Sequence, residues 1–237
     1  MKRTLPGILI LGAAGAALCA SSASYAEVGF PASGNISLFG SYMNQDTNVG
    51  LSPNGGGGGV QLGISLTPMF FVAGSYQYDY LYQRNANSSA FADLPAGGSL
   101  TYGERIDDGR AGGGIVFHLP ASPIDVFGKL EYVHFDYQYV HGVLNGASIG
   151  NGDRTSDDGV GWHGGAQIKL PLVSFYGSVG YIDMSHDSGP EFNVGGELPV
   201  APLTWLFAEY RYDNFHDGDD GVHTQFNNVR AGVRLVF

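Results

Sequence analysis

The chain has 237 residues and a formal net charge of −11, with 38 glycines, 13% aromatic residues and only 14% charged residues. This length suits one domain of barrel size, and the composition excludes a disordered or mainly helical chain. The acidic balance also argues against a nucleic-acid-binding role. Beyond the N-terminus, no stretch reaches the roughly 18 apolar residues of a spanning helix, so a membrane crossing would have to use strands.

The N-terminus has the layout of a secretory signal peptide. A charged start precedes an apolar stretch over residues 5–20, and Ser-Tyr-Ala at 24–26 is a cleavage site of the A-x-A type. We therefore expect a signal peptide over residues 1–26 and a barrel domain over residues 27–237.

Cys19 raises the alternative of a lipoprotein anchor. Leu18 disfavours it, because a small residue is needed directly before the lipidated cysteine. If Cys19 leaves with the signal, the mature chain has no cysteine, which suits the oxidising periplasm.

Ten segments alternate with period 2 and are rich in aromatic and β-branched residues, so we expect ten strands. Five of them share a small residue in one column, followed by a tyrosine of the same parity. These five segments are 39–42, 73–76, 127–132, 176–181 and 207–212. The partner segments are 59–66, 110–119, 160–170, 192–198 and 228–237.

The connections between these segments are of two kinds. Short turns with proline fall at 67–68, 120–123, 171–172 and 199–202. Longer polar stretches fall at 44–58, 84–104, 141–159, 186–191 and 213–222. The pattern predicts an all-β fold: a single antiparallel up-and-down transmembrane β-barrel of ten strands, with eight as the alternative, short periplasmic turns and long extracellular loops.

The five glycines at 55–59 are expected to form a flexible loop edge. A phosphate-binding loop would need a lysine and a following helix, and the sequence has neither at this place.

The last ten residues separate two faces. Alternate positions from Val229 to Phe237 are apolar, while Arg230 and Arg234 share the other parity. Such a strand makes sense if its apolar face meets lipid and its arginines point into a polar lumen. This ending resembles the C-terminal strand of small Gram-negative outer-membrane β-barrel proteins, the porin-like, opacity and OmpA-type surface barrels.

The resemblance implies residence in the bacterial outer membrane and a terminal Phe237 that acts as an assembly signal. It further implies contact with outer-membrane lipid and lipopolysaccharide, with the barrel-assembly machinery and with periplasmic chaperones. We expect a monomer with no nucleic-acid partner, no cofactor and no metal.

A soluble, lipocalin-like barrel would use the same alternation with the faces reversed. The placement of the aromatic residues favours a membrane barrel, because they form two bands on the apolar face. The band near the short turns comprises Phe70, Phe117, Phe175 and Phe237. The band near the long loops comprises Tyr42, Tyr76, Tyr78, Tyr132, Trp162, Tyr181, Tyr210 and Tyr212.

The opposite parity predicts the lining of the lumen. The polar lining is expected to comprise Arg110, Lys129, Glu131, His163, Lys169, Glu209, Arg211, Arg230 and Arg234. The aromatic residues expected to fill the lumen are Phe39, Phe127, Tyr176, Trp205 and Phe207, lying over glycines of the neighbouring strands. These aromatic residues either close the periplasmic half of the lumen or are core residues with no gating role.

For the charges, an internal salt-bridge network is favoured over an ion path, because buried charges are costly unless they are paired. Glu209 could pair with Arg230 or with Arg234.

The aspartates outside the predicted strands are expected at or above the outer rim. They include Asp107, Asp108, Asp153, Asp157, Asp158, Asp183, Asp187, Asp213, Asp217, Asp219 and Asp220. The stretch 217–221 hints at a calcium loop but lacks the ligand order of an EF-hand, so a solvated face is favoured.

Ten strands also raise the possibility of an omptin-like hydrolase at the rim. His186 near Asp183 and Asp187, or His216 near Asp217, could supply a His–Asp pair. Flexible Gly/Asp loops do not give the fixed geometry that general-base catalysis needs, so we expect no catalytic residues. The sequence favours a non-enzymatic barrel with a structural or surface-interaction role and a largely filled, charged lumen. The alternative is a narrow porin-like channel for ions or small solutes.

Overall fold

The computed structural model describes residues 34–48, 50–87, 99–144, 147–148, 154–217 and 221–237. The signal peptide expected over 1–26 lies outside these residues. Within them the chain is built from strands, and it contains no helix long and apolar enough to cross a membrane. The strands are β1 Gly34–Thr47, β2 Asn54–Ser65, β3 Phe70–Asn87, β4 Ser99–His118, β5 Ile124–Leu144, β6 Ala147–Ser148, β7 Arg154–Lys169, β8 Ser174–Met184, β9 Asp187–Ala201, β10 Thr204–Asp217 and β11 His223–Val236.

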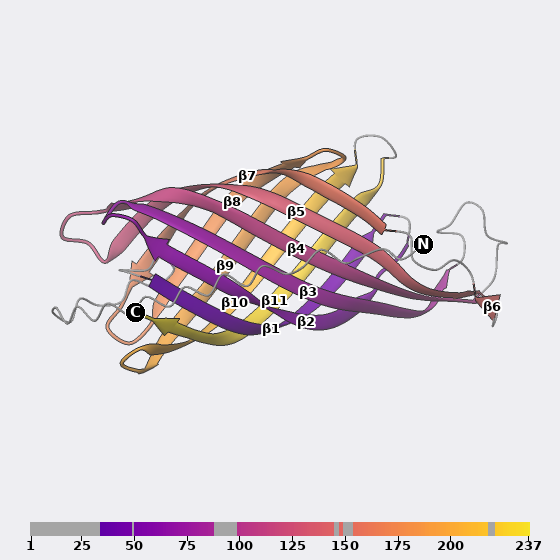
Figure 1. Ribbon diagram of the computed structural model, residues 1–237, viewed down its shortest axis with the longest axis horizontal. Helices are drawn as coiled ribbons and strands as arrows, with labels where there is room; N and C mark the ends of the chain where they lie inside the picture. The colour runs from indigo at the N-terminus through magenta and orange to yellow at the C-terminus, as the bar shows by residue number, and fades with distance from the viewer. Residues whose placement is uncertain (1–33, 49, 88–98, 145–146, 149–153, 218–220) are drawn as a thin grey trace, which may run out of the picture.

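The strands close into a barrel of ten long antiparallel strands (Figure 1). Neighbours in the chain are neighbours in the ring, and the two-residue strand β6 extends only from the end of β5. The ring closes where β1 pairs with β11, from Asn35 opposite Val236 to Thr47 opposite Thr224. The predicted up-and-down barrel of ten strands is therefore confirmed, and the eight-stranded alternative is wrong.

The last residue completes the seam between the first and last strands. The backbone N–H of Gly34 donates to the carbonyl oxygen of Phe237 at 2.9 Å, and the N–H of Phe237 donates back to Gly34 at 2.9 Å. The edges of an open sheet would expose unpaired N–H and C=O groups, which the bilayer interior cannot satisfy. Closure removes those edges.

The barrel is apolar on its outside and polar on its inside. Leu38, Leu130 and Val179 face outward and are at least 60% exposed, whereas Arg211 is 2% exposed. A soluble barrel would show the reverse distribution, because its core is apolar and its charges face water. This surface is that of a barrel surrounded by lipid.

Aromatic residues flank the outward apolar belt at both ends. Phe70, Phe117, Phe175 and Phe237 are exposed near the four short connections. Tyr42, Tyr76, Tyr132 and Trp162 are exposed toward the other end, and Trp162 stacks on Tyr181 with ring centroids 5.3 Å apart. Bands of this kind mark the two interfaces of a membrane.

The two ends of the barrel differ in their connections. We call the end with connections 66–69, 119–123, 170–173 and 202–203 the turn end, and the opposite end the loop end. At the loop end the strands run further than the sequence predicted. The expected loop over 44–58 shrinks to 48–53, and that over 186–191 to 185–186. These two connections are shorter than predicted, because polar side chains do not end a strand whose backbone stays paired. Parts of the loops expected over 84–104, 141–159 and 213–222 lie outside the described residues.

The five glycines at 55–59 were expected in a loop but form part of β2. They pair with β1 on one side and with the tyrosine-rich β3 on the other. A Cβ on Gly57 would lie 1.7 Å from the carbonyl oxygen of Tyr78. The glycines therefore allow β2 and β3 to approach closely.

Gly57→Ala should therefore destabilise the folded barrel by about 1–3 kcal/mol, because the added methyl group overpacks the β2–β3 contact. Gly40→Ala is the matched control, since a Cβ there would lie 3.9 Å from the carbonyl oxygen of Gly57. Urea unfolding in lipid vesicles measures both changes. Equal stability of the two variants would contradict this role for Gly57.

Candidate functional site: a charged lumen between two apolar layers

The inward positions of the strands carry most of the basic residues of the described chain. Of the polar residues that the sequence assigned to the lumen, two are half-buried, Lys129 and Lys169. The others are buried: Arg110, Glu131, His163, Glu209, Arg211, Arg230 and Arg234. Alternation along regular strands explains this placement, since every second side chain points to the same face.

Asp108 on β4 is the centre of the charge network. Its carboxylate lies 2.9 Å from Nε of Arg110, 2.6 Å from Nη2 of Arg211 and 3.9 Å from Nη2 of Arg230. Arg211 stands on β10, five strands from β4 in either direction around the ring. The Asp108–Arg211 ion pair therefore crosses the lumen and joins opposite walls.

The assignment of the acidic residues to the outer rim is wrong for several of them. Asp108, Asp157 and Asp213 have inward parity and are buried, whereas Asp107 has outward parity and is covered by Tyr76 and Arg105. The chain continues in strand conformation through each of them, so that parity rather than polarity decides where the side chain lies.

A second cross-lumen contact runs from Arg110 to β9. Nη1 of Arg110 lies 2.6 Å from Glu191 and 3.2 Å from Glu131. The ring of His163 lies between the same two carboxylates, with Nε2 3.0 Å from Glu131 and Nδ1 3.5 Å from Glu191. Four strands thus contribute to one cluster.

The remaining lumen charges pair nearer to their own strands. Glu209 pairs with Arg230 at 3.1 Å. Arg234 pairs with Glu197 instead, and its Nε donates to Ser37 Oγ at 2.8 Å across the β1–β11 seam. Lys129 pairs with Glu131 at 2.7 Å, and Lys169 pairs with Asp125 at 2.5 Å.

An aromatic layer fills the lumen on the turn-end side of the network. Phe39 and Phe207 meet edge to face at 6.3 Å, and the Arg230 and Arg234 guanidinium groups lie 5.3 and 5.2 Å from their ring centroids. Phe127, Tyr176 and Trp205 are half-buried. Four inward rings lie against glycines on which a Cβ would come within 2.4–2.6 Å: Phe39 on Gly59, Phe71 on Gly114, Phe127 on Gly165 and Tyr176 on Gly195.

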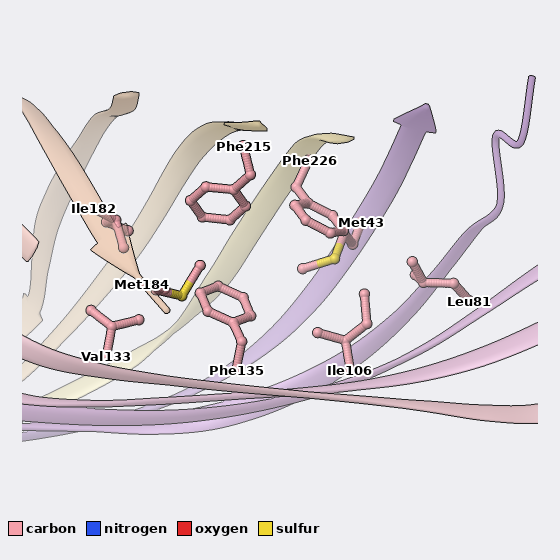
Figure 2. Close-up of a cluster of buried hydrophobic side chains, with 9 residues drawn as sticks. All are labelled: Met43, Leu81, Ile106, Val133, Phe135, Ile182, Met184, Phe215 and Phe226. Atoms are coloured by element: carbon pink, nitrogen blue, oxygen red, sulfur yellow. The ribbon is translucent and has the colours of Figure 1, made fainter. Parts of the chain in front are cut away.

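A second apolar layer, which the sequence did not predict, lies on the loop-end side. We call it the apolar plug (Figure 2). Its members are Met43, Leu81, Ile106, Val133, Phe135, Ile182, Met184, Phe215 and Phe226. Phe215 meets Phe135 and Phe226 edge to face, with centroids 5.5 and 6.1 Å apart. Side chains from seven strands thus meet inside the barrel.

The plug escaped prediction because most of its residues lie beyond the ends of the predicted strands. The signal was present, however. Continuing the inward parity of β5 from Glu131 leads to Val133 and Phe135, and continuing that of β10 from Arg211 leads to Phe215. The inward parity of each strand, continued beyond the first polar residue, therefore predicts this layer.

Glu131, His163 and Glu191 could in principle hold a metal, because their ligand atoms all lie within 4.8 Å of one another. Arg110 contacts both carboxylates and Lys129 contacts one of them. A divalent ion would have to displace these cations from a site with little access to water. The cluster is better described as part of the ion-pair network.

The lumen keeps a cavity of about 170 Å³ between the aromatic layer and the network. Arg110, Glu131, Glu191, Glu209 and Arg230 are among its lining residues. Nη2 of Arg110 and Nε of Arg230 are buried and have no hydrogen-bond partner among the described residues. A polar cavity of this size has room for water molecules that would satisfy them.

The histidines considered for hydrolysis have other surroundings than expected. Nδ1 of His186 lies 3.3 Å from Asp157, whose carboxylate also accepts the backbone N–H groups of His186 and Asp187 at 3.1 and 3.0 Å. This is the geometry of a carboxylate that holds a tight turn. His216 lies against His223, with ring centroids 4.1 Å apart.

Asp108→Asn should destabilise the barrel by about 3–5 kcal/mol, because it removes one counter-charge from a group of three buried guanidinium groups. The matched control is Asp183→Asn, at an exposed position on β8, which should change stability by less than about 0.5 kcal/mol. Urea unfolding in lipid vesicles gives both values. Equal effects at the two positions would contradict the assigned role of Asp108.

No protein-family model matches this sequence, and no curated protein matches it. The solved structures do provide matches. The β domain of the Bordetella autotransporter BrkA is 14% identical, with a TM-score of 0.52, and the match covers 86% of this chain and 100% of that one. Ail of Yersinia pestis is 15% identical, with a TM-score of 0.39, and the match covers 86% and 99%.

The outer membrane protease OmpT of Escherichia coli is 8% identical, with a TM-score of 0.45, and the match covers 86% of this chain and 96% of that one. At these identities the likeness speaks for the fold alone. Together with the apolar outward belt and the closed ring, the likeness to the BrkA β domain identifies the fold as that of a transmembrane β-barrel.

Proposed function

We propose that this chain is a non-enzymatic outer-membrane β-barrel with a structural or surface-interaction role and a lumen that does not conduct. The observation that carries the proposal is the filling of the lumen. The apolar plug, the ion-pair network and the aromatic layer follow one another along the barrel axis. A solute on this path would have to separate buried ion pairs and pass through close-packed side chains.

The energetic argument is one of desolvation. An ion in the plug would lose its water and find only hydrocarbon, at a cost of tens of kcal/mol in the limiting case. Phe135, Phe215 and Phe226 are each 1% exposed, so their side chains have almost no contact with water. A lumen built in this way favours stability over transport.

The proposal includes an orientation and a set of partners. The turn end, which carries both Gly34 and Phe237, would face the periplasm, where chaperones and the assembly machinery meet the terminal strand. The loop end would face outward, with lipopolysaccharide around its tyrosine-rich band. We propose a monomer, because the belt is complete around the ring and needs no second copy to cover it.

A narrow channel is the second candidate. The cavity of about 170 Å³ beside the network supports it, since this part of the lumen is not filled by side chains. Conduction would then require the apolar plug to open.

Planar-bilayer recording separates the two candidates. The purified wild-type barrel, with insertion verified by flotation of the same protein in liposomes, should give no reproducible single-channel steps. Steps of constant amplitude that scale with salt concentration would contradict the closed lumen and favour the channel.

A further inference from the structure

The histidines of the chain fall into two groups. The structure describes the side chains of six, and four of these have a carboxylate oxygen close to a ring nitrogen. The four pairs are His118 with Asp125 at 2.8 Å, His134 with Asp158 at 2.6 Å, His163 with Glu131 at 3.0 Å and His186 with Asp157 at 3.3 Å. The other two, His216 and His223, lie against each other.

His216 and His223 are held side by side by the backbone. They are direct partners in the β10–β11 ladder, and their ring centroids are 4.1 Å apart at an interplanar angle of 37°. The backbone N–H of His223 donates to the side-chain oxygen of Asn48 at 3.1 Å, which ties the start of β11 to the end of β1. The two imidazoles are therefore positioned before any ligand arrives.

The pair is open to water. Both residues are exposed and have outward parity. On this wall the aromatic band ends at Tyr212, which pairs with Asn227, and His216 and His223 stand two outward rows beyond it. Dissolved ions can reach them without entering the bilayer.

Two adjacent imidazoles suit one class of ligand. Histidine nitrogen is a preferred ligand of Zn²⁺, Cu²⁺ and Ni²⁺, and two such nitrogens can bind one ion while water fills the remaining positions. The strongly acidic chain adds a field that attracts cations. We propose that His216 and His223 form a surface site for a divalent first-row transition ion, a role independent of the proposed function of the lumen.

Zinc titration tests this site. Untagged barrel in detergent, titrated with Zn²⁺ in an isothermal calorimeter, should show saturable binding of one ion. His216→Ala and His223→Ala should each weaken binding at least tenfold, because each removes one of two ligands. His186→Ala is the matched control, since it removes an exposed loop-end histidine that faces Asp157, and it should leave the affinity unchanged.

Folding of each variant is checked by its heat-modifiable migration on a gel, so that a lost site is distinguished from a lost barrel. A second readout is thermal: Zn²⁺ should raise the melting temperature of the wild type but not that of a folded His216→Ala variant. Absence of saturable binding by the wild type would overturn the proposal. So would full retention of binding in both single variants.

Discussion

Charge buried inside the barrel has to be paired, and the rest of the lumen is arranged around that constraint. Asp108 is the point where pairing is densest, because three arginines from three strands approach its carboxylate. Its contact with Arg211 joins walls that lie five strands apart around the ring. Hydrogen bonds of the sheet hold neighbouring strands together, whereas only side chains can join opposite walls. The network therefore fixes the cross-section of the barrel as well as neutralising its interior.

The two apolar layers make this pairing stronger. Phe39 and Phe207 limit access of water from the turn end, and Phe135 and Phe215 limit it from the loop end. With less water nearby, each ion pair acts in a lower dielectric, where attraction between charges is larger and an unpaired charge costs more. Apolar packing and charge pairing are thus interdependent. Removal of the layers would hydrate the network, and removal of one member of an ion pair would leave its partner unpaired beside hydrocarbon.

Much of the fold could be predicted from the sequence, because period-2 alternation encodes both faces of a strand. Parity alone predicts that Arg230 and Arg234 point inward and that the alternate positions from Val229 to Phe237 point outward. The structure places them in this way. The ends of several strands were predicted wrongly. Acidic and glycine-rich stretches were interpreted as loops, yet Asp213 and Gly57 lie in paired strands. The partners within the network were beyond the sequence, because pairing across the lumen depends on barrel diameter and stagger, which alternation does not encode.

The most direct test of the cross-lumen constraint is a double-mutant cycle on Asp108 and Arg211. Asp108→Asn, Arg211→Gln and the double variant would be compared with the wild type by urea unfolding in lipid vesicles. If the ion pair joins the walls, the double variant is less destabilised than the sum of the single variants, by about 1–3 kcal/mol. Additivity of the two single effects within about 0.5 kcal/mol would mean that the residues act independently, which would contradict this account.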